Sequence, residues 1–129
     1  MNVVQIHLVA GWTGMLGGVI SGAGIGLFFH RERWLGGYAA LARRLIRLGH
    51  IAFFGLGFLN LFFAMSIAQA PIAPALANVA SKALIAGAIA MPLCCFAAAW
   101  RTSLRHLFPI PVACVLVGIV GLLIGWAIQ

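Results

Sequence analysis

A lysine, Lys82, lies near the start of an apolar stretch that is long enough to cross a membrane, residues 78–100 (NVASKALIAGAIAMPLCCFAAAW). A lysine at the centre of a membrane helix costs about 2.5–3.5 kcal/mol, and less near the ends. Either its long side chain reaches back to the lipid headgroups, or its ammonium group binds an anionic partner. Asn78, Ser81 and Gln69 favour a small polar pocket around it. The only acidic residue, Glu32, lies in the predicted loop between the first two apolar stretches, on the opposite side of the membrane from Lys82. A counter-ion for Lys82 would therefore have to come from a ligand, a lipid or another subunit.

The chain has four histidines, and His7 is the one that lies well inside an apolar stretch. An imidazole can bind a metal or a haem iron through one nitrogen while the other is oriented by a hydrogen bond. Two axial ligands of one haem must lie at similar depth in the membrane. Because His7 and His30 are about 34 Å apart along a helix, they cannot bind the same iron. On the side of His7, the depths allow a haem with His7 as iron ligand and Lys82 as second ligand or as partner of a propionate. On the other side, His50 could pair with His106 or His30.

Glycines follow His7 along the first apolar stretch at intervals of three or four residues. They are Gly11, Gly14, Gly18, Gly22 and Gly26. Such a stripe allows either another helix or a flat ligand to approach the backbone closely. The sequence therefore leaves two alternatives, close helix packing or a groove for a planar cofactor. Asn60, the one polar residue at mid-depth of the second apolar stretch, is expected to bond across to a neighbouring helix.

Other kinds of chemistry find little support. The sequence has no carboxylate pair for acid–base catalysis, no Ser-His-Asp set and no phosphate-binding loop, which argues against a hydrolase or an ATPase. Cys94, Cys95 and Cys114 lie inside apolar stretches without the spacing of a zinc site, and we interpret them as small apolar fillers. Redox chemistry through a bound cofactor remains, because the cofactor supplies the reactivity.

The composition defines the elements that must position these residues. Hydrophobic residues make up 64% of the 129 residues and charged residues 7%, whereas soluble domains carry about 25% charged residues. We expect one all-α transmembrane domain, residues 1–129, folded as a four-helix bundle. The predicted spans are 3–29, 51–69, 78–100 and 110–128, each long enough for a hydrocarbon core of about 30 Å.

The basic residues fall almost entirely in two of the three predicted loops, 30–50 and 101–109. The positive-inside rule places these loops in the cytoplasm and both termini outside, and it explains the net charge of +7 without nucleic-acid binding. Within the first loop, residues 38–48 (YAALARRLIRL) alternate apolar and basic side chains. They predict a short amphipathic helix lying in the membrane interface.

The layout resembles the bacterial four-helix, haem-binding protoporphyrinogen IX oxidases (the HemJ type) and, more distantly, CopD-like membrane proteins. A histidine near the start of the first helix and a lysine in the third are the signature of that group, and His7 and Lys82 fall on these positions. Three further segments are similar: GLFFH (26–30), RRLIR (43–47) and RHLFPIPV (105–112). The chain departs from the group at residues 92–94 and 108–111, which bears on the substrate more than on the scaffold.

The resemblance implies a haem b protein of the bacterial cytoplasmic membrane, with His7 on the iron, Gly11, Gly14 and Gly18 beside the ring, and Lys82 as the catalytic residue. Electrons would pass from a porphyrinogen-like or quinol donor through the haem to the quinone pool. The alternative is a non-catalytic accessory subunit of a larger respiratory or photosynthetic complex, because such a small chain acts mainly through other membrane subunits or further copies of itself. A transporter is less favoured, since no inverted repeat or polar pore stripe is present.

Overall fold

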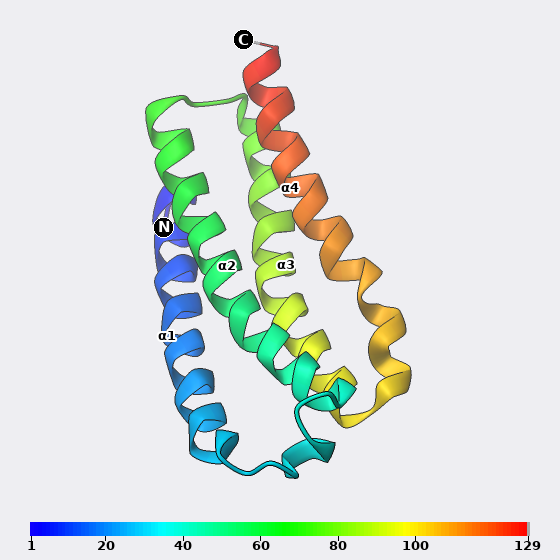
Figure 1. Ribbon diagram of the computed structural model, residues 1–129. Helices are drawn as coiled ribbons and strands as arrows, with labels where there is room; N and C mark the ends of the chain where they lie inside the picture. The colour runs from blue at the N-terminus through cyan, green and yellow to red at the C-terminus, as the bar shows by residue number, and fades with distance from the viewer. Residues whose placement is uncertain (129) are drawn as a thin grey trace.

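The computed structural model describes residues 1–128. Four long helices, α1 (Val3–Phe29), α2 (Leu41–Gln69), α3 (Pro74–Trp100) and α4 (Pro109–Ala127), carry the fold, and two short 3₁₀ helices, η1 (Trp34–Gly36) and η2 (Thr102–Leu107), lie in the connections (Figure 1). No strand occurs among these residues. Each of the four segments is long and apolar enough to cross a membrane. The predicted all-α four-helix fold is confirmed, and the chain is a multi-pass membrane protein.

The helices run up and down, and each packs mainly on its neighbours in the chain. α1 packs on α2, α2 on α3, and α3 on α4, whereas α1 touches α3 much less. The connections 30–40 and 101–108 lie at one end of the molecule, while residues 70–73 and both termini lie at the other (Figure 1). The two basic connections therefore share one end, as the positive-inside pattern requires.

Helix α2 differs from the prediction. Residues 41–48 do not form a separate interfacial helix but are the first two turns of α2, which is 29 residues long. Inside this segment Arg43 and Leu45 are both buried. At Gly49, a Cβ atom would lie only 3.0 Å from Cβ of Cys95, so α2 is already packed closely on α3 at this point. Packing against α3 thus makes residues 41–48 part of α2, whereas the amphipathic pattern alone predicted a separate interfacial helix.

Arg43 fixes the first connection. Its buried guanidinium donates hydrogen bonds to three carbonyl groups at and beyond the end of α1, those of Phe29 (2.8 Å), Arg31 (3.3 Å) and Glu32 (3.3 Å). The last carbonyl groups of a helix lack partners and carry partial negative charge, so a cation is favoured there. The guanidinium also lies 3.7 Å from the centroid of the Tyr38 ring. Sequence reasoning counted Arg43 as one more loop charge and missed this role.

Candidate functional site

A buried polar cluster joins the first three helices. His7 of α1 is fully buried, with Nδ1 2.6 Å from Oδ1 of Asn60 on α2 and Nε2 2.8 Å from Oγ of Ser81 on α3. The amide nitrogen of Asn60 donates to the carbonyl of Leu56 at 2.7 Å, which fixes the orientation of the amide group. The predicted bond from Asn60 across to a neighbouring helix is confirmed.

These partners define the tautomer of His7. The carbonyl oxygen of Asn60 can only accept, so Nδ1–H of His7 must donate to it. In a neutral imidazole Nε2 then has only a lone pair, and it accepts from the hydroxyl group of Ser81. The Phe63 ring covers the imidazole at a centroid distance of 4.4 Å. Both ring nitrogens are therefore satisfied inside the protein, and the cluster acts as a polar clamp between α1, α2 and α3.

Lys82 follows Ser81 directly but does not join this cluster. Successive residues of a helix are rotated by about 100°, so Ser81 points inward and is buried while the side chain of Lys82 is exposed. Within residues 1–128, no hydrogen bond or ion pair involves the Lys82 side chain. Asn78 and Gln69 are also exposed, so of the polar pocket expected around Lys82 only Ser81 turns inward, and it binds His7.

Helix α2 packs on the glycine stripe of α1 from Gly11 to Gly22. A Cβ atom at Gly14 would lie 3.1 Å from Cα of Gly57, and one at Gly18 would lie 2.5 Å from Cε2 of Phe54. At Gly11 it would lie 2.9 Å from the carbonyl oxygen of Gly57. Of the two alternatives that the sequence left open, the structure shows close helix packing. At Gly11 and Gly18, α2 occupies the space beside the backbone that a planar ligand would need; Gly14 also borders an apolar groove, and a Cβ atom at Gly26 meets nothing within 4 Å.

The residues around His7 do not fit a haem in this arrangement. Iron ligation needs a free lone pair on a ring nitrogen that faces the ligand, whereas Nε2 of His7 is bonded to Ser81 and the ring is sealed. At the other end, His50 lies with Nδ1 3.2 Å from the Ser21 hydroxyl, and His30 and His106 are exposed. Ligation by His50 with His106 or His30 stays a prediction. No group of three His, Cys, Asp or Glu side chains suited to a metal ion occurs in the described part of the chain.

Two apolar grooves flank α2. The first, here called the α1–α3 groove, has a volume of about 490 Å³, with α2 as its floor. Its walls include Ile6 and Val9 of α1 and Ile85 and Ile89 of α3. Lys82, Ile85 and Ile89 stand at positions i, i+3 and i+7, which share one face of a helix. Lys82 therefore stands at the end of this groove, on the face of α3 that forms its wall.

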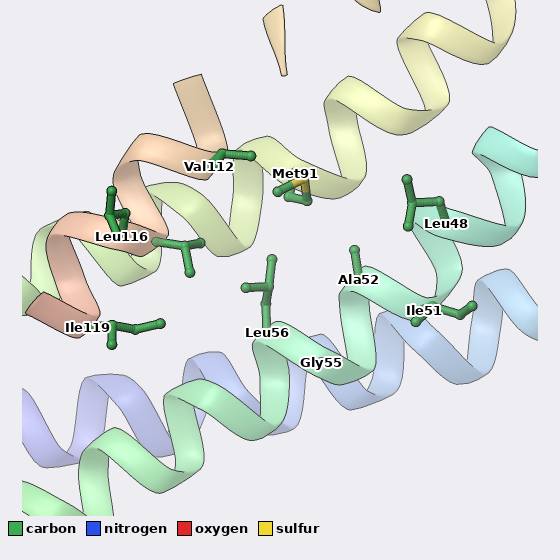
Figure 2. Close-up of a pocket in the computed structure, with 10 residues that line it drawn as sticks. Leu48, Ile51, Ala52, Gly55, Leu56, Met91, Val112, Leu116 and Ile119 are labelled. Atoms are coloured by element: carbon green, nitrogen blue, oxygen red, sulfur yellow. The ribbon is translucent and has the colours of Figure 1, made fainter. Parts of the chain in front are cut away.

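The second groove, here called the α2–α4 groove, has a volume of about 450 Å³ and lies between α2 and α4 with α3 behind it (Figure 2). Only apolar side chains and Gly55 line it. Neither groove contains a histidine, a cysteine or an acidic residue among its lining residues.

Comparison of the chain with protein-family models, with curated proteins and with solved structures gives no match. The resemblance to the HemJ-type and CopD-like proteins therefore stays a prediction.

Proposed function

We propose that this chain is a non-catalytic subunit of a larger membrane complex, and that its partner packs along the α1–α3 groove with a carboxylate group opposite Lys82. One observation carries the proposal: Lys82 is an exposed ammonium group inside an apolar span, and no described residue pairs with it. Charged residues within membrane spans are costly and usually pair with another charge or line a functional path.

The depth of Lys82 is compatible with a counter-ion on a partner helix. Lys82 is eight residues beyond Pro74, which is about 12 Å along the axis. A helix of 27 residues is about 40 Å long, and centring it on a core of about 30 Å leaves about 5 Å at each end. The backbone of Lys82 then lies about 7 Å inside the hydrocarbon, where a carboxylate on a partner helix is a counter-ion at the same level. A second copy of this chain has no acidic side chain to offer there, because Glu32 lies in the connection at the opposite end.

The state of the buried polar groups supports a non-catalytic role. Both nitrogens of His7 are engaged with Asn60 and Ser81, so the intramembrane imidazole serves packing and has no free position for a substrate. We further propose that the complex belongs to a bacterial cytoplasmic membrane and that the end with the connections 30–40 and 101–108 faces the cytoplasm.

The experiment is photo-crosslinking in native membranes with p-benzoylphenylalanine in place of Ile89, an exposed residue that lines the α1–α3 groove, so that Lys82 itself is kept. The control position is Val19, which is exposed on α1 but does not line the groove. We expect position 89, and not position 19, to give an adduct with a membrane protein whose crosslinked helix carries Asp or Glu. Co-purification of that protein should be lost in Lys82→Met and kept in Lys82→Arg.

Two results would overturn the proposal. Adducts at position 89 with lipid only would show that no partner helix packs along the α1–α3 groove. A purified protein with a Soret band that disappears in His7→Ala would favour the haem protein that the sequence predicts, with His7 released from Ser81.

A further inference from the structure

The α2–α4 groove begins close to the basic end of the molecule. On α2 it runs from Leu48 to Leu56, eight residues or about 12 Å. On α4 it begins at Val112, three residues after the helix starts at Pro109. The groove therefore lies in the membrane half next to the connections 30–40 and 101–108, and its length approaches the 15 Å or so of one leaflet's hydrocarbon. Figure 2 shows Leu48, Ala52 and Leu56 facing Val112 and Leu116, with Met91 of α3 behind them.

An unpaired arginine stands at the mouth of this groove. Arg44 precedes Leu48 by four residues, so both lie on the same face of α2. Its side chain is exposed and makes no hydrogen bond within residues 1–128, unlike that of Arg43, which is bound to the end of α1. Arg44 is only three residues, about 4.5 Å, from the start of α2 at Leu41, which places it at the level of lipid headgroups.

We infer that the α2–α4 groove and Arg44 form a binding site for an anionic phospholipid of the leaflet at the basic end. One acyl chain lies in the apolar groove, and the phosphate group accepts hydrogen bonds from the guanidinium of Arg44. Guanidinium groups bind phosphate through paired N–H donors, and the groove offers the chain an entirely apolar lining. The position of the cation favours the α2–α4 groove over the α1–α3 groove as the lipid site. Arg44 lies at the level of the headgroups, whereas Lys82 lies inside the span. This inference is independent of the proposed partner subunit.

The test uses the full chain, purified in a neutral detergent and stripped of lipid. Binding is measured by native mass spectrometry with phosphatidylglycerol and with phosphatidylcholine of identical acyl chains, and separately with inorganic phosphate as competitor. We expect phosphatidylglycerol to bind more tightly. Arg44→Gln should weaken that binding about fivefold, the loss expected for one arginine near a membrane surface. The control Arg33→Gln removes another exposed arginine and should have little effect.

A second variant tests the acyl chain. A Cβ atom at Gly55 meets no atom within 4 Å, and Gly55 lines the groove, so the side chain of Gly55→Leu can extend into it. Gly24→Leu is the control, because Gly24 is equally open but lies on α1, away from this groove. We expect Gly55→Leu to weaken phosphatidylglycerol binding, and to change the thermal unfolding of the lipid-free protein no more than Gly24→Leu does, since both gain the helix propensity of leucine.

Three outcomes would overturn the inference. Equal losses in Arg44→Gln and Arg33→Gln would mean that binding follows the overall charge of the basic end. An unchanged affinity in Gly55→Leu would mean that no acyl chain lies in the groove. Full competition by inorganic phosphate would mean that Arg44 binds a free anion instead of a lipid.

Discussion

Gly11 allows α1 and α2 to approach closely, and replacing it tests the packing that seals His7. A Cβ atom at Gly11 would lie 2.9 Å from the carbonyl oxygen of Gly57 and 2.5 Å from Cγ of Leu61. Ordinary contacts begin at 3.4 Å, so in Gly11→Ala the two helices must separate by about 0.5 Å and Leu61 must change its conformation. Added atoms in a packed interior cost about 1–3 kcal/mol.

Replacing a glycine by alanine also stabilises a helix through helix propensity, which opposes the loss expected at Gly11, so a matched control is needed. Alanine is better than glycine in a helix by up to about 1 kcal/mol, at Gly11 as at any other position of α1. At Gly24, on the same helix, a Cβ atom meets nothing within 4 Å, so Gly24→Ala gains the propensity alone. The difference between the two variants isolates the contact, and we expect Gly11→Ala to be less stable than Gly24→Ala by about 1–3 kcal/mol.

The assay is unfolding in mixed micelles with increasing fractions of sodium dodecyl sulfate, followed by circular dichroism. Each variant is compared with the parent chain at the same lipid and detergent composition. If Gly11→Ala and Gly24→Ala unfold at the same fraction of dodecyl sulfate, α1 and α2 do not pack through Gly11, and the clamp around His7 loses its structural basis.

Three further predictions use the same unfolding assay. Arg43→Lys should destabilise the chain by about 1–3 kcal/mol because it removes hydrogen bonds from a charged group to the end of α1; Arg44→Lys, at an exposed position, should be neutral. Asn60→Leu should lower the free energy of unfolding by about 1–3 kcal/mol, since Nδ1–H of His7 is then buried without an acceptor. Stability equal to that of the parent chain would contradict a stabilising role of the His7–Asn60–Ser81 cluster. Gly37→Ala should lower the free energy of unfolding by about 1–3 kcal/mol, because φ 96° and ψ 176° are accessible essentially to glycine alone. An unchanged unfolding midpoint would show that the connection 30–40 can change its backbone conformation without cost.

The number and order of the helices could be predicted because each apolar stretch reaches the length of a membrane span. The rotation of each helix about its own axis could not be predicted. In a membrane the outward face of a helix is as apolar as the inward face, so the pattern of hydrophobic residues does not indicate which side is buried. The sequence therefore favoured Lys82 as the neighbour of His7, whereas rotation of α3 brings the adjacent Ser81 there instead.

The partners of His7 are also remote in sequence. Asn60 and Ser81 are 53 and 74 residues away, and only the packed helices bring them together. The place of Asn60 as a lone polar residue at mid-depth gave a correct indication of a bond between helices. For Arg43, the available signal was the aromatic residues Phe29, Trp34 and Tyr38 around the first connection, whose rings surround the guanidinium.

Because each terminal helix packs chiefly on its immediate neighbour, α1 with α2 and α3 with α4, the molecule is built from two hairpins laid side by side. Each hairpin can be inserted and assembled as a unit during synthesis, before the other has left the ribosome. The chain should therefore tolerate a break in the short connection of residues 70–73, with the two fragments reassociating when co-expressed. Reassociation would be guided by the hydrogen bond from Ser81 of the second fragment to His7, whose ring Asn60 already orients within the first fragment.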